Sequence, residues 1–153
     1  MSRSSLLLKL ELESNAEMLC VVRHASGQLA ETLGFSSADC RAVVLAVDEA
    51  LTNIIRHAYH GEKGRPIHVS FRRIDVARNG REEKALEIVL EDRGAKVDPA
   101  KLCGRPLEKV QPGGLGLHFI KECMDTVEFS RTFGKNQLRL IKLLGAARPE
   151  KGS

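Results

Sequence analysis

Two alternating apolar runs joined by an Asn-Gly pair constrain the fold of this chain more than any other feature. Apolar and polar residues alternate over much of residues 67–76 and again over 85–91. A period of two predicts strands that bury one face. Asn79-Gly80, which lies between the runs, is typical of the tight turn of a hairpin because both residue types tolerate a positive φ. The sequence therefore predicts an antiparallel pair of strands.

Before this hairpin, the sequence predicts one strand and two helices. The strand covers residues 5–13 and places four leucines on one face: Leu6, Leu8, Leu10 and Leu12. Apolar residues at helical spacing follow it, with serine and asparagine caps at the start and glycine at the end. The expected bounds are from Ser14 or Asn15 to about Leu33, and from Ser36 and Ser37 to about Tyr59.

After the hairpin, the sequence predicts a long loop, a third helix and a second strand pair. Residues 92–113 are rich in proline and glycine, and loops of this length usually have a function. The helix is expected from near Gly114 to near Asp125. The last two strands are expected over 126–132 and 137–144, joined at residues 134–136.

The order of these elements is strand, two helices, two strands, loop, helix and two strands. Strand pairs outnumber crossovers, so the prediction is an α+β fold: a two-layer α/β sandwich with a mostly antiparallel sheet and helices on one face. A chain of 153 residues fits a single domain over 1–153. The tail over about 146–153 is expected to be disordered.

Composition excludes several classes of function. The net charge of +4 permits binding of an anionic nucleotide or an acidic protein, but no basic run is interleaved with aromatics, so direct nucleic-acid binding is not expected. No apolar run approaches the roughly 20 residues of a membrane span. The four cysteines are scattered without a C-x-x-C pair, which argues against a zinc site or a disulfide framework. We expect a cytoplasmic protein without membrane partners.

A polar stripe interrupts the second helix. Glu49, Asn53 and His57 are spaced four apart, so on an α-helix they share one face. An amide oxygen suits Mg²⁺, which takes its other ligands from water and phosphates, and a carboxylate one turn away can accept a proton. The same stripe is also compatible with polar residues that simply face solvent.

Two further motifs follow in the chain. Asp92 and Gly94 end a strand, where a carboxylate can accept a hydrogen bond from an exocyclic amine and a glycine allows close approach of a ligand; a simple turn is the alternative. A glycine-rich segment then enters the third helix, where backbone N–H groups favour phosphate; a flexible linker is the alternative. Its residues are Gly113, Gly114, Leu115, Gly116 and Leu117.

In this order, the three motifs resemble the GHKL, or histidine kinase-like, ATPase superfamily, with its Bergerat-type ATP-binding fold. The similarity covers about residues 10–143 and is strongest to the anti-sigma-factor serine/threonine kinases, on the run from Asp48 to Asn53 with His57-Ala58-Tyr59 after it. Other matching segments are Asp92-Arg93-Gly94 with Asp98-Pro99, and residues 114–117 with Met124-Asp125.

The resemblance implies roles for individual residues. Asn53 is expected to hold the Mg²⁺ of bound ATP, with His57 close to the nucleotide, and Glu49 to act as the base that activates a substrate serine. Asp92 is expected to bind the adenine amino group, with Gly94 making room for the base. The glycine-rich segment is expected to contact phosphates, and residues from about 100 to 113 to form the lid. The superfamily's second glycine is Lys96 here, which either crowds or contacts the nucleotide.

The resemblance also implies partners. In this family the substrate is a STAS-domain anti-sigma-factor antagonist, the other partner is a sigma factor, and the kinase is a homodimer. Two alternatives stay open: a non-catalytic, ATP-gated protein-binding module of the same fold, and an isolated histidine-kinase catalytic domain. The second is disfavoured because the chain begins near the first strand of the fold, which leaves no room for a phosphoacceptor helix.

Overall fold

The computed structural model describes residues 3–97 and 116–145. Its elements in chain order are β1 (Ser4–Glu13), α1 (Met18–Thr32), α2 (Ser37–Asn53), the π-helix η1 (Ile54–Ala58), β2 (Pro66–Arg78), β3 (Arg81–Asp92), α4 (Gly116–Cys123), β4 (Thr126–Thr132) and β5 (Lys135–Leu143). Among the described residues, none of the helices combines the length and the apolar character that a membrane span requires. The predicted disordered tail lies outside the described residues.

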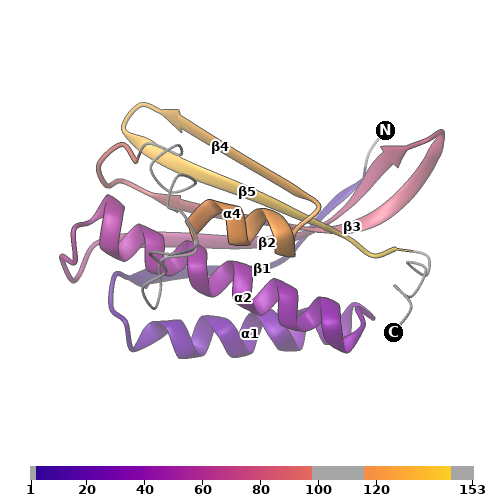
Figure 1. Ribbon diagram of the computed structural model, residues 1–153, viewed down its shortest axis with the longest axis horizontal. Coiled ribbons are helices and arrows are strands. Elements are labelled where there is room, and N and C mark those ends of the chain that lie inside the picture. The colour runs from indigo at the N-terminus through magenta and orange to yellow at the C-terminus, as the bar shows by residue number, and fades with distance from the viewer. Residues whose placement is uncertain (1–2, 98–115, 146–153) are drawn as a thin grey trace.

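The architecture is the predicted α+β sandwich. The strands form one sheet in the order β1-β2-β3-β5-β4, and every neighbouring pair is antiparallel. The helices α1, α2 and α4 lie together on one face of this sheet (Figure 1). Alternate residues of the three central strands point toward them, because residues that pair directly across antiparallel strands share a face. Those fully buried on this face include Ile67, Val69, Phe71, Ile88, Leu90 and Leu140.

The two hairpins have turns of the same kind. Asn79 and Gly80 both have positive φ, 51° and 75°, as the Asn-Gly signal predicts for a two-residue turn. Between β4 and β5 the positive φ values fall on Phe133 and Gly134. The second turn was expected at residues 134–136 and is therefore placed earlier in the structure. As a consequence, Asn136 lies inside β5 and is 2% exposed.

The prediction that four leucines of the first strand share one face is wrong for Leu6. The register of β1 against β2 shifts between Leu6 and Leu8, which indicates a β-bulge. Leu8 pairs with Phe71 on the helix side, whereas Leu6 pairs with Arg72 and is 50% exposed. An extra residue in one strand reverses the facing of everything beyond it, because side chains alternate with a period of two.

Helix boundaries follow local capping with one correction. The Ser36 side chain accepts a hydrogen bond from the Asp39 N–H at 3.1 Å and begins α2 as predicted. The α1 helix begins at Met18, later than its expected cap at Ser14 or Asn15. The Ser14 hydroxyl instead donates to the Glu62 carbonyl, at 2.7 Å, so it fastens the loop before β2.

The second helix does not stay α-helical to Tyr59. It changes after Asn53 to a π-helix, η1, and the Tyr59 N–H donates to the Ile54 carbonyl five residues before it, at 2.9 Å. A π-turn widens the helix, so residues on either side no longer follow the four-residue spacing. Such turns occur often at functional sites, and this one borders the cavity described next.

Candidate functional site

A cavity opens between the helices and the carboxyl end of β3. The empty space counted together with its open mouth is about 520 Å³. Most of its wall is apolar, and three polar side chains face it. The lining residues are Ala50, Asn53, Ile54, Ala58, Leu90, Asp92, Val97, Leu117, Ile120, Phe129, Asn136 and Leu138. An apolar pocket with a few polar groups suits a planar heterocycle.

Asp92 is the one acidic residue of this wall. It ends β3, is 5% exposed, and its Oδ1 accepts hydrogen bonds from the Gly94 N–H at 2.8 Å and from Asn136 Nδ2 at 2.9 Å. Burial raises the pKa of Asp92, while the bonds from Asn136 and Gly94 and the charge of Arg131 act in the opposite direction. Burial outweighs these contributions, so the pKa of Asp92 remains raised; when ionised, the carboxylate is a hydrogen-bond acceptor only.

Asn136 and Arg131 connect this carboxylate to the β4–β5 hairpin. Asn136 Nδ2 also donates to the Ala95 carbonyl at 3.0 Å, and its Oδ1 accepts from Arg131 Nη1 at 2.7 Å. The same Arg131 nitrogen donates to the Gly94 carbonyl at 3.0 Å. These bonds fix both the carboxylate and the segment after it. The sequence prediction missed Asn136, which was expected to lie in a turn.

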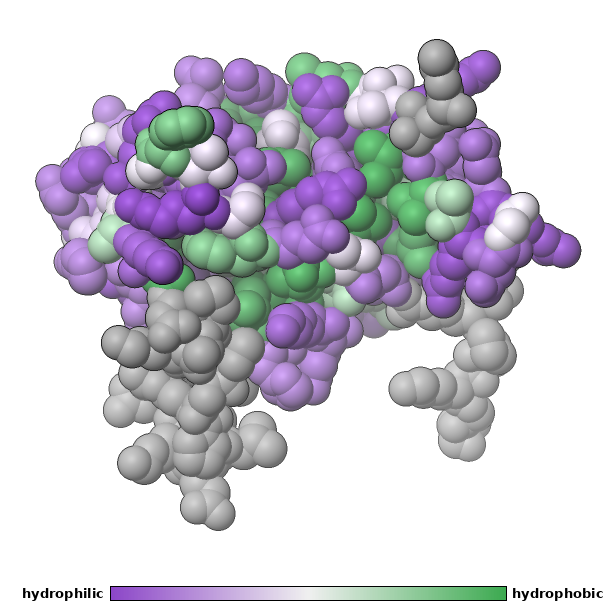
Figure 2. All heavy atoms as spheres, turned by 90° about the horizontal axis from the view of Figure 1, so that it is seen from above, coloured by the Kyte–Doolittle hydropathy of each residue, from purple (hydrophilic) through white to green (hydrophobic). Residues whose placement is uncertain are grey.

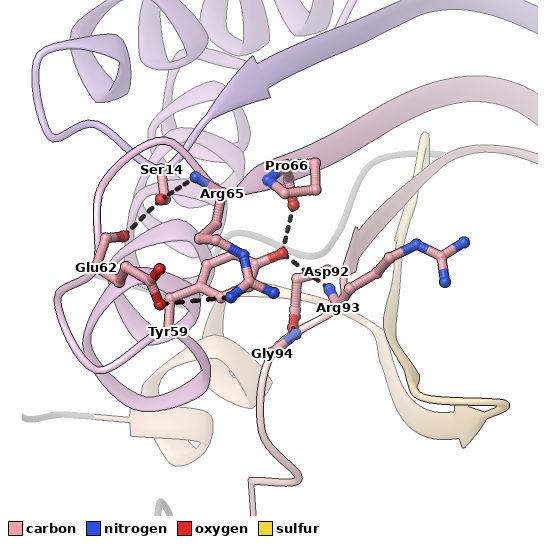
Figure 3. Close-up of polar contacts among 8 residues, drawn as sticks. All are labelled: Ser14, Tyr59, Glu62, Arg65, Pro66, Asp92, Arg93 and Gly94. Atoms are coloured by element: carbon pink, nitrogen blue, oxygen red, sulfur yellow. Dashed lines mark hydrogen bonds and ion pairs between the residues drawn. The ribbon is translucent and has the colours of Figure 1, made fainter.

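Tyr59 holds the same segment from the other side, and Figure 3 shows it at the centre of its neighbours. Its hydroxyl donates to the Pro66 carbonyl at 2.5 Å and accepts from the Arg93 N–H at 2.8 Å. Burial raises the pKa of Tyr59, so it stays protonated. The Arg65 guanidinium lies 4.9 Å from the ring centroid. Tyr59 therefore joins the end of the helix layer to the start of β2 and to the residue that follows the end of β3.

Gly94 is in contact with the π-helix. A Cβ at this position would lie 2.6 Å from the carbonyl carbon of Ala58 and 2.7 Å from its Cβ. The Ala95 N–H donates to the Ala58 carbonyl at 2.8 Å. This approach requires glycine even without a ligand. The expectation that Gly94 makes room for a base is a separate, functional prediction, and the structure supplies a packing reason beside it.

The polar stripe divides at the start of η1. Asn53, the last residue of α2, lines the cavity. Glu49 lies one turn earlier on α2, is partly buried and is not in the cavity wall. His57 lies within η1 and is exposed, so the predicted continuation of the stripe fails because its α-helical spacing does not apply there. Of the three residues, only Asn53 is brought to the cavity wall.

The remaining predicted residues lie at the mouth or outside the described chain. Leu117, in the first turn of α4, is 6% exposed and lines the cavity, and Gly116 begins that helix. Lys96 is exposed. The predicted phosphate contacts at Gly113, Gly114 and Leu115, and the predicted lid over about 100–113, lie outside the described residues.

The residues fit a purine nucleotide with one metal ion. Asp92 can accept a hydrogen bond from an exocyclic amine while the apolar wall covers the ring. No group of three His, Cys, Asp or Glu side chains that could hold a metal occurs in the described ranges 3–97 and 116–145. Mg²⁺ needs no such group, because it takes one or two protein ligands together with water and phosphate oxygens. The Asn53 side chain is a suitable oxygen ligand in the same cavity.

Comparison with known families agrees with this geometry. The model of the histidine kinase-like ATPase domain matches residues 12–142. The chain belongs to this family. Family membership implies ATP binding, in agreement with the placement of Asp92 and Asn53 in one apolar cavity.

Among curated relatives, a serine-protein kinase RsbW from Oceanobacillus iheyensis is 29% identical over 135 residues, which covers 83% of this chain and 80% of the relative. An RsbW from Bacillus thuringiensis is 28% identical over 139 residues, covering 86% and 81%. These proteins, like the family match, support the resemblance to anti-sigma-factor serine kinases.

Two solved structures share the fold. The RsbU and RsbW domains of a Mycobacterium tuberculosis protein align with a TM-score of 0.59 and 17% identity, over 93% of this chain and 34% of that longer one. SiaB, in a SiaB–SiaC complex from Pseudomonas aeruginosa, aligns with a TM-score of 0.53 and 17% identity, over 91% of both chains. Both likenesses concern the arrangement of helices and strands.

Proposed function

We propose that this chain is an ATP-dependent protein serine/threonine kinase of the anti-sigma regulatory type. It phosphorylates a serine or threonine of a STAS-domain antagonist and sequesters a sigma factor or another regulatory protein, acting in the cytoplasm as a homodimer. The observation that carries the proposal is the placement of Asp92 and Asn53 in one apolar cavity. The names of the curated relatives support the kinase activity.

Each polar residue of the site has a role in this proposal. Asp92 accepts a hydrogen bond from the adenine amino group, and Asn136 and the Gly94 N–H orient its carboxylate. Asn53 binds Mg²⁺, which when present neutralises phosphate charge. Glu49 takes the proton from the substrate hydroxyl. Phosphoryl transfer depends mainly on positioning and charge stabilisation, so few groups are needed.

A non-catalytic, ATP-gated binding module is the second candidate. Glu49 does not line the described cavity, and this observation favours a protein that binds ATP without transferring phosphate. The two candidates share the nucleotide site and differ in the need for a base. SiaB shows that a protein of this fold can occur in a complex with another protein.

Transfer of labelled phosphate separates the candidates. The STAS-domain proteins encoded in the source genome are purified one by one and incubated with the chain, Mg²⁺ and γ-labelled ATP. We expect one of them to be labelled on serine or threonine, and Glu49→Gln to lower the rate at least about a hundredfold. Glu31→Gln, an exposed change on α1, is the matched control. ATP binding without labelling of any of these proteins would favour the binding module.

A further inference from the structure

The β4–β5 turn carries the most exposed aromatic side chain of the described residues. Phe133 is 99% exposed, and its φ is +51°. A bulky residue at positive φ is an outlier, whereas asparagine and glycine adopt this conformation readily. The β2–β3 turn, with positive φ at the same two positions, has Asn79 and Gly80 there. Phe133 therefore costs folding stability and gains no buried contact in return.

Basic side chains lie beside this aromatic. Arg131 and Lys135 stand two residues before and after Phe133. Arg93 directly follows Asp92, the β-sheet partner of Asn136, and with Lys135 it lines a shallow groove at this edge of the sheet. Arg93 is exposed and forms no ion pair with another residue of the described ranges. Lys135 pairs with Glu91 at 3.4 Å and Arg131 donates to Gly94 and Asn136, so Arg93 is the cation of this surface that has no acidic partner among the described residues.

Hydrogen bonds connect the turn to the cavity. Arg131 donates to the Gly94 carbonyl and to Asn136, as described above, so the hairpin is tied to the segment after Asp92. Phe129, on the same strand, lines the cavity. Figure 1 places the β4–β5 turn at the same end of the molecule as the segment after β3, and Figure 2 shows a small hydrophobic patch among hydrophilic residues at that end. A partner held here lies near the nucleotide.

We propose that Phe133 and Arg93 form a docking site for the protein substrate, which presents an apolar pocket bordered by carboxylates. This proposal rests on the proposed function. The exposed aromatic supplies the apolar anchor typical of interaction hot spots, and the basic side chains select acidic surface and speed encounter. Nucleic acid is less well matched, because single-strand binders stack successive bases on several aromatics. The other aromatics of the chain are Phe35, Tyr59, Phe71, Phe119 and Phe129, which are buried, partly buried or in the cavity wall.

The decisive variant is Phe133→Asn, because stability and docking respond to it in opposite directions. Asparagine suits the backbone at this turn, so the melting temperature should rise by about 2 °C. The KM for the STAS-domain protein that serves as substrate should rise at least about tenfold, with the KM for ATP unchanged. Leu6→Asn is the matched control. Leu6 is also exposed, but it lies on β1, at the opposite edge of the sheet from β4, and its replacement should not affect the KM.

Charge is tested separately with Arg93→Glu. This change should raise the KM for the STAS-domain protein at least about tenfold, and raising the ionic strength from about 0.05 to 0.5 M should weaken wild-type binding. An unchanged KM in Phe133→Asn, with wild-type protein active, would overturn the docking site alone. If wild-type protein labels and binds none of the STAS-domain proteins, both the proposed function and this site are contradicted. Two other outcomes would assign the surface to a different occupant, each with an unchanged KM in Phe133→Asn. If the variant lost a self-association that wild type shows, the occupant would be a second copy of the chain. If it lost binding to a single-stranded oligonucleotide, the occupant would be nucleic acid.

Discussion

Replacing Gly94 by alanine tests whether this glycine supports the fold before any ligand binds. The added Cβ would lie 2.6 Å from the Ala58 carbonyl carbon. A Cβ is attached directly to the backbone and the carbonyl carbon is part of it, so no side-chain rotation relieves the contact. Relief requires the segment after β3 to move away from the π-helix. Overpacking of this kind costs about 1–3 kcal/mol, and weakening of the Ala95–Ala58 hydrogen bond adds about 1 kcal/mol. We therefore expect a loss of about 2–4 kcal/mol in the free energy of unfolding.

The assay is thermal and urea unfolding of the protein without nucleotide. For a chain of this size, the expected loss lowers the melting temperature by about 4–16 °C. Gly145→Ala is the matched control, because a Cβ there meets nothing within 4 Å. If Gly94→Ala had the same melting temperature as wild type in the absence of ATP and lost only ATP affinity, the packing argument would be refuted. The glycine would then serve the ligand alone.

Three more substitutions probe the network around the cavity. Burial raises the pKa of Asp92 in the folded state, so its contribution to stability is present below the usual Asp pKa and is lost as the pH rises through the raised value. Asp92→Asn should remove that loss, so the variant should gain stability relative to wild type between acid and neutral pH. Thermal melts at acid and neutral pH that show the variant less stable than wild type at pH 7 only would contradict this. Asn136→Leu removes a donor to Asp92 and should cost about 2–4 kcal/mol in unfolding experiments and move the acid limb of ATP binding to higher pH; an unmoved limb would refute the link. Tyr59→Phe leaves the Arg93 N–H and the Pro66 carbonyl without this partner and should cost about 1–3 kcal/mol by urea titration, whereas a change below about 0.5 kcal/mol would show that water replaces the hydroxyl.

The predictable part of the fold is the part that local residues specify. The β2–β3 hairpin follows from alternation on both strands and from Asn79-Gly80, whose positive φ values need no tertiary contact. The start of α2 follows from the Ser36 cap. The bulge in β1 has no comparable local signal, and Leu6 was therefore assigned to the wrong face.

The candidate site shows the same division. Asn53 and Asp92 were predicted from motif order, and the structure brings both to one cavity. Asn136 was missed because its role depends on the register of β3 against β5, which pairs it with Asp92 across 44 residues. The π-helix was missed because the polar and apolar residues of α2 were extended with α-helical spacing to Tyr59, whose N–H instead donates to the carbonyl five residues before it. For the same reason, His57 was predicted to share the face of Glu49 and Asn53, although α2 ends at Asn53 and His57 lies in η1.

The central claim is that the cavity at Asp92 holds the adenine of ATP, and nucleotide discrimination by calorimetry tests it most directly. GTP carries an oxygen acceptor where ATP has its amino group, so it would place two acceptors in contact at the buried carboxylate. With Mg²⁺ at neutral pH, we predict one ATP per chain and at least about a hundredfold weaker binding of GTP, with Asp92→Asn losing the preference. Absence of ATP binding, or equal affinity for ATP and GTP in wild type, would contradict the account.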